Sequence, residues 1–144
     1  MRQLPQQQQS RIARYHGQSV RLLRDAMNEA RQARWLRTEE LLWGSVTLAV
    51  RSVALTRGDE VDDRKSVEEY AQALGLEHND RRIRDAFSRL STFVDVADRI
   101  RDSRGGAQQL ISILEDVTAA VEKLWEMAQA NDDPLLENEQ NHVR

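Results

Sequence analysis

Apolar residues recur along most of this chain at intervals of three and four positions, which places them on one face of an α-helix. The segment after Asn79 shows this most clearly, and its apolar face consists of Ile83, Ala86, Phe87, Leu90, Phe93, Val94, Ala97 and Ile100. The charged residues of the segment lie outside that face. We therefore predict an amphipathic helix that begins after a cap at Asn79 and buries one side in a core.

The segment from Glu39 to Gly58 is apolar over a much wider arc. Its polar stripe is narrow and consists of four residues, Glu40, Gly44, Thr47 and Arg51. A helix that is apolar over most of its circumference must be enclosed by other helices. We predict that this segment is the central helix of a bundle and that Gly58 ends it.

Three further segments have helical spacing. A first helix is expected from about Gln8 to Ala33, a short one from Ser66 to the residue before Gly75, and a last one from about Ala107 to Ala130. Glu69 stands three residues after Ser66, which is the pattern of a capping box. A turn is expected at residues 103–106. The inward-facing residues of these helices are Ile12, Val20, Leu23, Met27, Ala30, Val67, Tyr70, Ala71, Leu74, Leu110, Ile113, Leu114, Val117, Val121, Leu124 and Ala128.

These patterns predict an all-α fold, an up-and-down bundle of about five helices. A length of 144 residues suits one domain, and only two prolines and six glycines interrupt the helices. We assign residues 9–131 to the bundle. Residues 1–8 are expected to be a disordered lead, and the acidic residues 132–144 a disordered tail.

The apolar run from Leu41 to Thr56 does not suit a membrane span. Spanning a bilayer takes about 18 or more residues with few charges, and Arg51 interrupts this run. The first residues, MRQLPQQQQS, lack the apolar core of a signal peptide. The absence of cysteine excludes disulfides and cysteine-ligated metal. We therefore expect a cytoplasmic protein that does not bind a membrane.

Charge is distributed unevenly along the chain. The net charge is only −3, but residues 11–37 contain seven arginines against Asp25 and Glu29. Because a guanidinium group binds phosphate through a planar pair of donors, this helix is a candidate RNA-binding surface. The residues assigned to it are Arg14, Arg21, Arg24, Arg31 and Trp35, the aromatic residue that we expect to be most exposed. A coding bias of the source genome would also explain why 19 of the 21 basic residues are arginine.

The sequence contains no familiar catalytic or metal-binding set. The histidines fall in different predicted segments and are His16, His78 and His142. Gly105 and Gly106 form an isolated pair that is simpler as a turn than as a phosphate-binding loop. Asp95 and Asp98 stand one turn apart among arginines, as on a solvated helix face. We therefore expect no cofactor, no metal and no catalytic residues.

Small residues gather on one edge of the central helix. They are Gly44, Ser45 and Ser52. Such residues allow another helix to approach closely, either from a second copy in a homodimer or from the same chain. The sequence leaves both alternatives open.

One part of the sequence is similar to a known family. Residues 40–45 (ELLWGS), followed by residues 49–54 (AVRSVA) and by Arg57-Gly58, resemble the signature of the PaREP-type branch of the HEPN superfamily. That signature reads E-x-L-W-G-A, then A-V-K-A-x-A, then R-G. The similarity extends more weakly over residues 30–124. It implies a helical bundle that pairs into a dimer, in a superfamily whose active members cleave RNA.

Active members of the HEPN superfamily use an arginine, four to six intervening residues and a histidine on a later helix. The histidine acts on the ribose hydroxyl, and the arginine stabilises charge on the phosphate. At the corresponding place this chain has Ser91, which cannot act as a general base at neutral pH. Arg11 and His16 have the required spacing, but they lie on the first predicted helix. The resemblance therefore implies a protein that is not a ribonuclease of the usual HEPN type.

Three functions remain open from the sequence. The one we favour is a non-catalytic HEPN-like protein that binds RNA or a partner protein, such as the nucleotidyltransferase of a toxin–antitoxin pair. The second is a HEPN-type RNA endonuclease that acts through Arg11 and His16. The third is a small helical RNA-binding subunit of a CRISPR-type complex.

Overall fold

The computed structural model describes residues 5–99 and 106–132, and these residues form five α-helices and no β-strand. The helices are α1 (Gln6–Arg31), α2 (Trp35–Thr56), α3 (Arg64–Glu77), α4 (Arg81–Arg99) and α5 (Gly106–Asp132). The prediction of an all-α bundle of five helices is confirmed.

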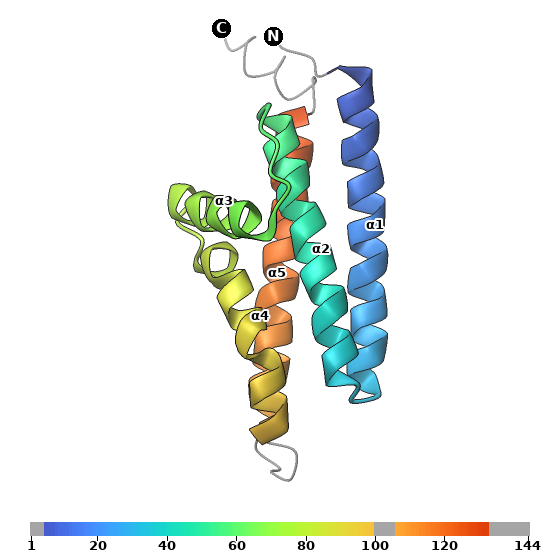
Figure 1. Ribbon diagram of the computed structural model, residues 1–144, viewed down its shortest axis with the longest axis vertical. Coiled ribbons are helices and arrows are strands. Elements are labelled where there is room, and N and C mark those ends of the chain that lie inside the picture. The colour runs from blue at the N-terminus through green and yellow to red at the C-terminus, as the bar shows by residue number, and fades with distance from the viewer. Residues whose placement is uncertain (1–4, 100–105, 133–144) are drawn as a thin grey trace, which may run out of the picture.

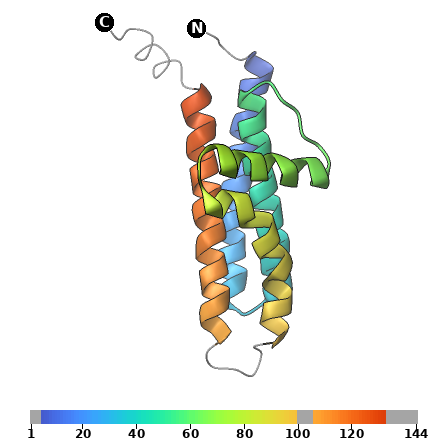
Figure 2. The same ribbon diagram turned by 90° about the vertical axis from the view of Figure 1, so that its left-hand side faces the viewer.

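Four of the five helices run along the long axis of the molecule in alternating directions, and α3 lies across them (Figures 1 and 2). The central position predicted for α2 is confirmed, because α2 contacts each of the other four helices. In contrast, α1 packs along α2 and touches α5 only locally. None of the described helices combines the length and the apolar run that a membrane span requires.

The core lies where α2, α3, α4 and α5 meet. Its largest fully buried side chains include Phe93, Leu42, Leu74, Ile83 and Leu90. The apolar faces predicted for α4 and α5 are buried there, with Val94 and Leu114 half-buried at the edge. Ile100 lies outside the described residues. Burial of these faces against one another is the main term that favours the folded state.

The buried line of α1 differs from the predicted one. It consists of Ile12, Ser19, Leu23 and Ala26, whereas Val20, Met27 and Ala30 are only half-buried. The inner face is therefore rotated toward a serine that hydrophobic periodicity does not select. Ser19 tolerates complete burial because its hydroxyl is hydrogen-bonded to α2 and α5.

The small residues of α2 pack within the same chain. Ser45 and Ser52 are buried, and Ser45 forms hydrogen bonds with Ser19 of α1. A Cβ atom added to Gly44 would lie 2.9 Å from Leu22 Cδ1, also in α1. The structure thus favours the intramolecular alternative for this edge. The homodimer stays a prediction.

The limits predicted for α3 are wrong at both ends. The helix begins at Arg64 rather than Ser66, because the side chain of Asp63 accepts a hydrogen bond of 2.7 Å from the Ser66 backbone N–H and so caps it. It continues through Gly75 to Glu77. Glycine is needed at position 75 for a close approach and does not end the helix, since an added Cβ atom would collide with the Arg84 backbone in α4.

Two other helix starts are shifted. The cap of α4 is Asp80, whose Oδ1 accepts from the Ile83 N–H at 3.1 Å, and Asn79 before it adopts a left-handed conformation with φ of 53°. α2 begins at Trp35, four residues before Glu39. Its end is as predicted, because Gly58 follows with φ of 79°.

Residues 1–4 of the predicted lead, residues 103–105 of the predicted turn at 103–106 and residues 133–144 of the predicted tail lie outside the described residues. The described parts of these segments are helical after Pro5: α1 already begins at Gln6, and α5 begins at Gly106 and continues to Asp132.

Candidate nucleic-acid interface

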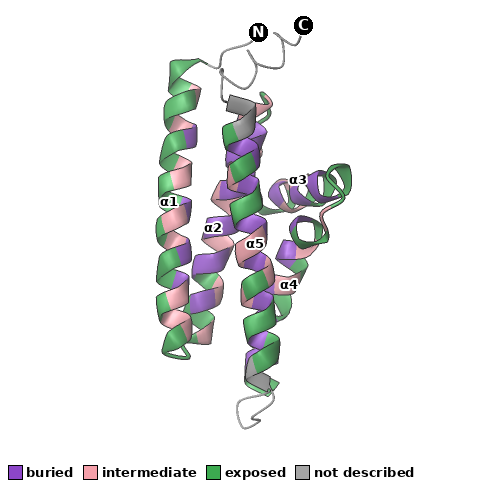
Figure 3. Cartoon of the chain, turned by 180° about the vertical axis from the view of Figure 1, so that it is seen from behind, coloured by how far each residue is buried: buried purple, intermediate pink, exposed green. Residues whose placement is uncertain are grey.

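Four arginines of α1 lie on the surface of the bundle. Arg14, Arg21, Arg24 and Arg31 are all exposed, on the side opposite the buried line of the helix. Because seven residues make almost two turns, Arg14 and Arg21 point in nearly the same direction, and Arg24 and Arg31 repeat this relation on an adjacent strip. We call these four residues the α1 arginine face. Figure 3 shows exposed residues along the outer side of α1.

The other described arginines in the first half of the chain are paired with carboxylates. Every arginine from position 34 to position 64 forms such a pair: Arg34 with Glu29, Arg37 with Glu40, Arg51 with Asp62, Arg57 with Glu77 and Arg64 with Glu68.

The α1 arginine face differs from this pattern. Within the described residues, Arg14, Arg21 and Arg24 have no hydrogen-bonding or ion-pair partner. Arg31 donates a hydrogen bond of 2.9 Å to the Asn28 side chain, which is neutral. The positive charge of this face is therefore not neutralised by direct contacts within the molecule.

Trp35 does not join the α1 arginine face. It is half-buried, and its ring meets Phe93 of α4 edge to face, with 5.9 Å between the ring centroids. Trp35 is therefore not exposed as expected, but its rank among the aromatic residues stays a prediction, because Tyr15, Trp43, Tyr70 and Trp125 are half-buried as well. The exposed apolar side chain at this turn is its neighbour Leu36, which is 63% exposed.

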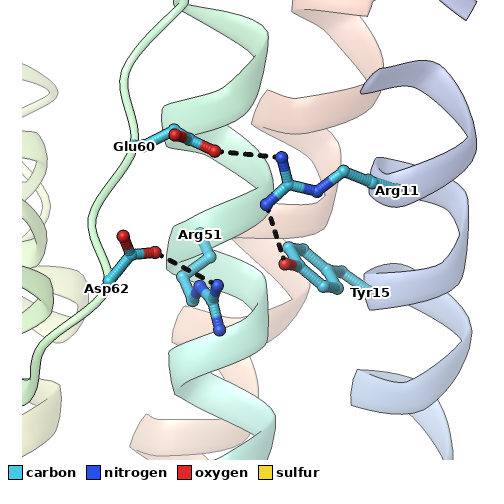
Figure 4. Close-up of polar contacts among 5 residues, drawn as sticks. All are labelled: Arg11, Tyr15, Arg51, Glu60 and Asp62. Carbon is cyan, nitrogen blue, oxygen red and sulfur yellow. Dashed lines mark hydrogen bonds and ion pairs between the residues drawn. The ribbon is translucent and has the colours of Figure 1, made fainter. Parts of the chain in front are cut away.

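Arg11 and His16 are not brought together. Arg11 donates from Nη1 to Glu60 at 2.9 Å and from Nη2 to the Tyr15 hydroxyl at 3.2 Å (Figure 4). The His16 ring instead lies edge-on to Trp125 of α5, with 5.1 Å between centroids. The two side chains thus serve different contacts and do not form the arrangement that joint action on a phosphodiester needs.

The Arg11 contacts belong to a larger cluster that holds the loop between α2 and α3 (Figure 4). The Tyr15 ring lies within 5.7 Å of the Arg11 Cζ and 5.0 Å of the Arg51 Cζ. Arg51 also donates to Asp62 of the loop at 3.4 Å. The Tyr15 hydrogen bond and the Glu60 carboxylate raise the pKa of Arg11. Two carboxylates match two guanidinium groups, so the cluster neutralises itself and fixes the loop.

The signature residues of α2 have packing roles. The Trp43 ring packs on Phe87 at a centroid distance of 4.8 Å, and the Arg64 Cζ lies 3.8 Å from its centroid. Ser91, at the place of the family histidine, is exposed and donates back to the Phe87 carbonyl at 2.9 Å. Trp43 and Trp125 are half-buried at the core edge, as predicted.

The remaining candidates stay separate. His78 contacts Arg57, and His142 lies outside the described residues. Asp95 and Asp98 are exposed, as expected for a solvated face. Among the described residues, no group of histidine, aspartate and glutamate side chains could hold a metal ion.

Sequence periodicity missed one set of polar residues that the fold brings together. Arg82 and Arg89 of α4 both contact Asp116 of α5. The density of arginine at the start of α4 was a visible signal, but the partner lies 27 residues beyond Arg89, so local spacing could not reveal it.

Comparison with protein-family models, with curated proteins and with solved structures finds no match for this chain. The resemblance to the HEPN superfamily therefore stays a prediction.

Proposed function

We propose that this protein is a non-catalytic helical bundle that binds RNA through the α1 arginine face. The observation that supports this function is the contrast in pairing. Arg14, Arg21 and Arg24 are exposed without a partner among the described residues, whereas every arginine from position 34 to position 64 is paired with a carboxylate. Unpaired guanidinium groups on one surface attract phosphates and release counterions when they bind them.

The geometry favours recognition of the RNA backbone over recognition of bases. At a rise of about 1.5 Å per residue, the three unpaired arginines extend over about 15 Å of helix, and arginine forks suit phosphate oxygens. Base stacking needs an aromatic platform, but Tyr15 of α1 is held between two guanidinium groups and Trp35 packs on Phe93. We therefore expect weak sequence preference.

The geometry gives less support to an RNA endonuclease. The proposed pair, Arg11 and His16, is divided between contacts to Glu60 and to Trp125. A role in a toxin–antitoxin pair or a CRISPR-type complex, a nucleotidyltransferase partner, a homodimer and a cytoplasmic location stay predictions. Each of them is compatible with RNA binding by α1.

Salt dependence of binding to a labelled single-stranded RNA tests the proposal. Affinity should fall as salt rises, with a log–log slope of roughly 0.7 for each phosphate contacted. Changing Arg14, Arg21 and Arg24 together to Gln should weaken binding by roughly tenfold or more and reduce the slope by about 2. Changing them to Glu should weaken binding further, because each site then repels phosphate.

A matched control keeps the same net charge change. Arg37, Arg84 and Arg99 are also exposed, but Arg37 and Arg84 are in ion pairs and all three lie outside α1. Changing these three to Gln should leave RNA affinity close to that of the wild type. Equal losses in the two triple variants would show that overall charge, and not the α1 arginine face, determines binding.

A further inference from the structure

A small pocket lies between α4 and α5, and its lining is rich in arginine. Its volume is about 160 Å³. From α4 it is lined by three arginines, Arg81, Arg82 and Arg89, and by Asp85 and Ala86. From α5 it is lined by Asp116 and Val117. A pocket for a whole drug-sized ligand is typically about 300 Å³ or more. This one is large enough for a single polar group.

The carboxylates of the pocket do not match its guanidinium groups one to one. Asp116 is shared, since its Oδ1 lies 3.4 Å from Arg82 Nε and its Oδ2 accepts from Arg89 Nη2 at 2.9 Å. Asp85 accepts two hydrogen bonds of 2.9 Å from Arg84, which does not line the pocket. Arg81 has no ion pair within the described residues. The pocket therefore has an excess of positive charge.

The positive charge around the pocket also lowers the pKa of Asp85. The hydrogen bond from Arg84 is the main reason that the pKa of Asp85 is lowered, and the charges of Arg81 and Arg89 lower it further. Arg81 and Arg89 thus stabilise the charged form of the Asp85 carboxylate, which is already paired with Arg84.

One donor of the pocket lacks an acceptor. Arg89 Nε is buried and has no hydrogen-bond partner, and it is the single side-chain atom of this kind among the residues that the structure describes. A buried donor without an acceptor is destabilising, and more so when the group is charged. This atom is covered by its neighbours, so the part of Arg89 that can meet a ligand is the rest of its side chain, which is 40% exposed and lines the pocket.

We propose that this pocket binds a phosphate group through Arg81, Arg82 and Arg89. A phosphate monoester has the oxygens and the charge that guanidinium forks bind best. The limited volume suits a terminal phosphate, as in a nucleotide, at the end of an RNA strand or in the inorganic ion, and leaves no room for a base in the same pocket.

This site is separate from the α1 arginine face. α2 and α5 lie between α1 and α4 (Figures 1 and 2). Phosphate binding here therefore does not depend on the RNA-binding role of α1.

Calorimetric titration of the full chain with inorganic phosphate and with pyrophosphate, at constant ionic strength in chloride, tests the proposal. Arg81→Gln and Arg89→Gln should each weaken binding by roughly tenfold, because each removes a charge-assisted hydrogen bond. Asp116→Asn should have the opposite effect and tighten binding, since it removes the carboxylate that competes with the ligand. Circular dichroism of each variant confirms that it is folded.

Arg37→Gln is the matched control, because Arg37 is exposed on α2, does not line the pocket and changes net charge by the same amount when it is lost. It should leave phosphate binding unchanged. No heat from the wild type, or equal binding by the wild type and Arg89→Gln, would overturn the proposal. So would weaker binding by Asp116→Asn.

A comparison of two RNA strands with identical sequence identifies the source of the phosphate. In the variant in which Arg14, Arg21 and Arg24 are Gln, a strand with a 5′-phosphate should bind more tightly than one with a 5′-hydroxyl if the pocket takes strand ends. Equal binding of the strands, with retained binding of inorganic phosphate, assigns the pocket to small phosphate compounds.

Discussion

The two sides of α2 are built from different kinds of side chain. Toward α4 and α5 it meets a core of aliphatic and aromatic residues, which includes Leu90 and Phe93. Toward α1 it presents Gly44 and Ser45. Among the described residues, every buried polar side chain lies in α1 or α2, and these are Ser19, Thr38, Ser45 and Ser52. We call the contact between α1 and α2 around these residues the serine seam.

The apolar core and the serine seam differ in how precisely they fix the position of one helix against another. A packed apolar core resists changes in volume, but its attraction has little direction. The serine seam is directional: Ser19 Oγ donates to the Ser45 carbonyl at 2.8 Å, and Ser45 Oγ donates to the Ser19 carbonyl at 2.9 Å. Trp125 Nε1 of α5 donates to Ser19 Oγ at 3.0 Å. The seam therefore fixes the register of α1 and with it the direction of the exposed arginines.

Two helical glycines give the sharpest test of the contrast. Gly75→Ala should destabilise the protein by about 3 kcal/mol, because the added methyl group collides with the Arg84 backbone and the two helices must separate. Urea unfolding monitored by circular dichroism measures this loss.

Gly44→Ala is the control from the serine seam. The added methyl group there meets the end of the Leu22 side chain, which can rotate, and alanine has better helix propensity by about 1 kcal/mol. We expect a net change of less than about 1 kcal/mol. Similar losses in the two variants would contradict the view that α3 and α4 meet at backbone distance while α1 and α2 do not.

A smaller effect on stability is expected when the buried serines of α1 and α2 are changed, and it should differ between Ser19 and Ser52. Ser19→Ala should cost about 2 kcal/mol, because it removes the acceptor of the Trp125 N–H and the hydroxyl that donates to the Ser45 carbonyl inside the α1–α2 contact. Thermal and urea unfolding measure the loss. Ser52 is equally buried but donates only to the Leu48 carbonyl of its own helix. Ser52→Ala should therefore change the stability by less than about 1 kcal/mol, and a larger loss there would contradict this distinction.

The smallest expected effect is a loss of stability at low pH that involves Glu77. The hydrogen bond from Arg57 lowers the pKa of Glu77 at the end of α3, so the stability that Glu77 contributes is present above its ordinary value of 4.5 and is lost as pH falls through the lowered pKa. Glu77→Gln should be less stable than the wild type at pH 7, and the difference should vanish at low pH. The hydrogen bonds of the serine seam are made by serine and tryptophan side chains, which do not titrate, so acid should not change them in this way.

Melting temperatures between pH 7 and pH 3 measure the effect. Glu69→Gln is the control, because Glu69 is an exposed carboxylate of the same helix without an ion pair in the described residues. A difference between Glu77→Gln and the wild type that grows as pH falls would have the wrong sign for a lowered pKa.

Local sequence was enough to predict the inner faces of α4 and α5, because helical periodicity depends only on spacing. It was not enough at Gly75, which looks like a helix end unless one knows that the Arg84 backbone lies against it. Ser19 was missed for a similar reason, since the groups that make its burial tolerable come from two other helices.

The candidate sites were also predictable from the sequence only in part. Exposure of Arg14 and Arg21 follows from their spacing on one helix. Whether an arginine is paired depends on tertiary structure, because Glu60 lies 49 residues from Arg11 and Asp116 lies 27 residues from Arg89. For the same reason the pocket of Arg81, Arg82 and Arg89 could not be found from the sequence.

The serine seam also sets the order in which the molecule opens. α1 contacts α2 and little else, and it contributes only four buried residues, one of them a serine. Only Leu23 and Ala26 of α1 belong to the main buried apolar cluster, so its separation leaves most of the core shared by α2, α4 and α5 in place. Such an element forms a cooperative unit of its own with a lower opening free energy than the rest. In native-state hydrogen exchange, we expect the amides of α1 to exchange by partial opening and those of α4 and α5 to exchange only on global unfolding.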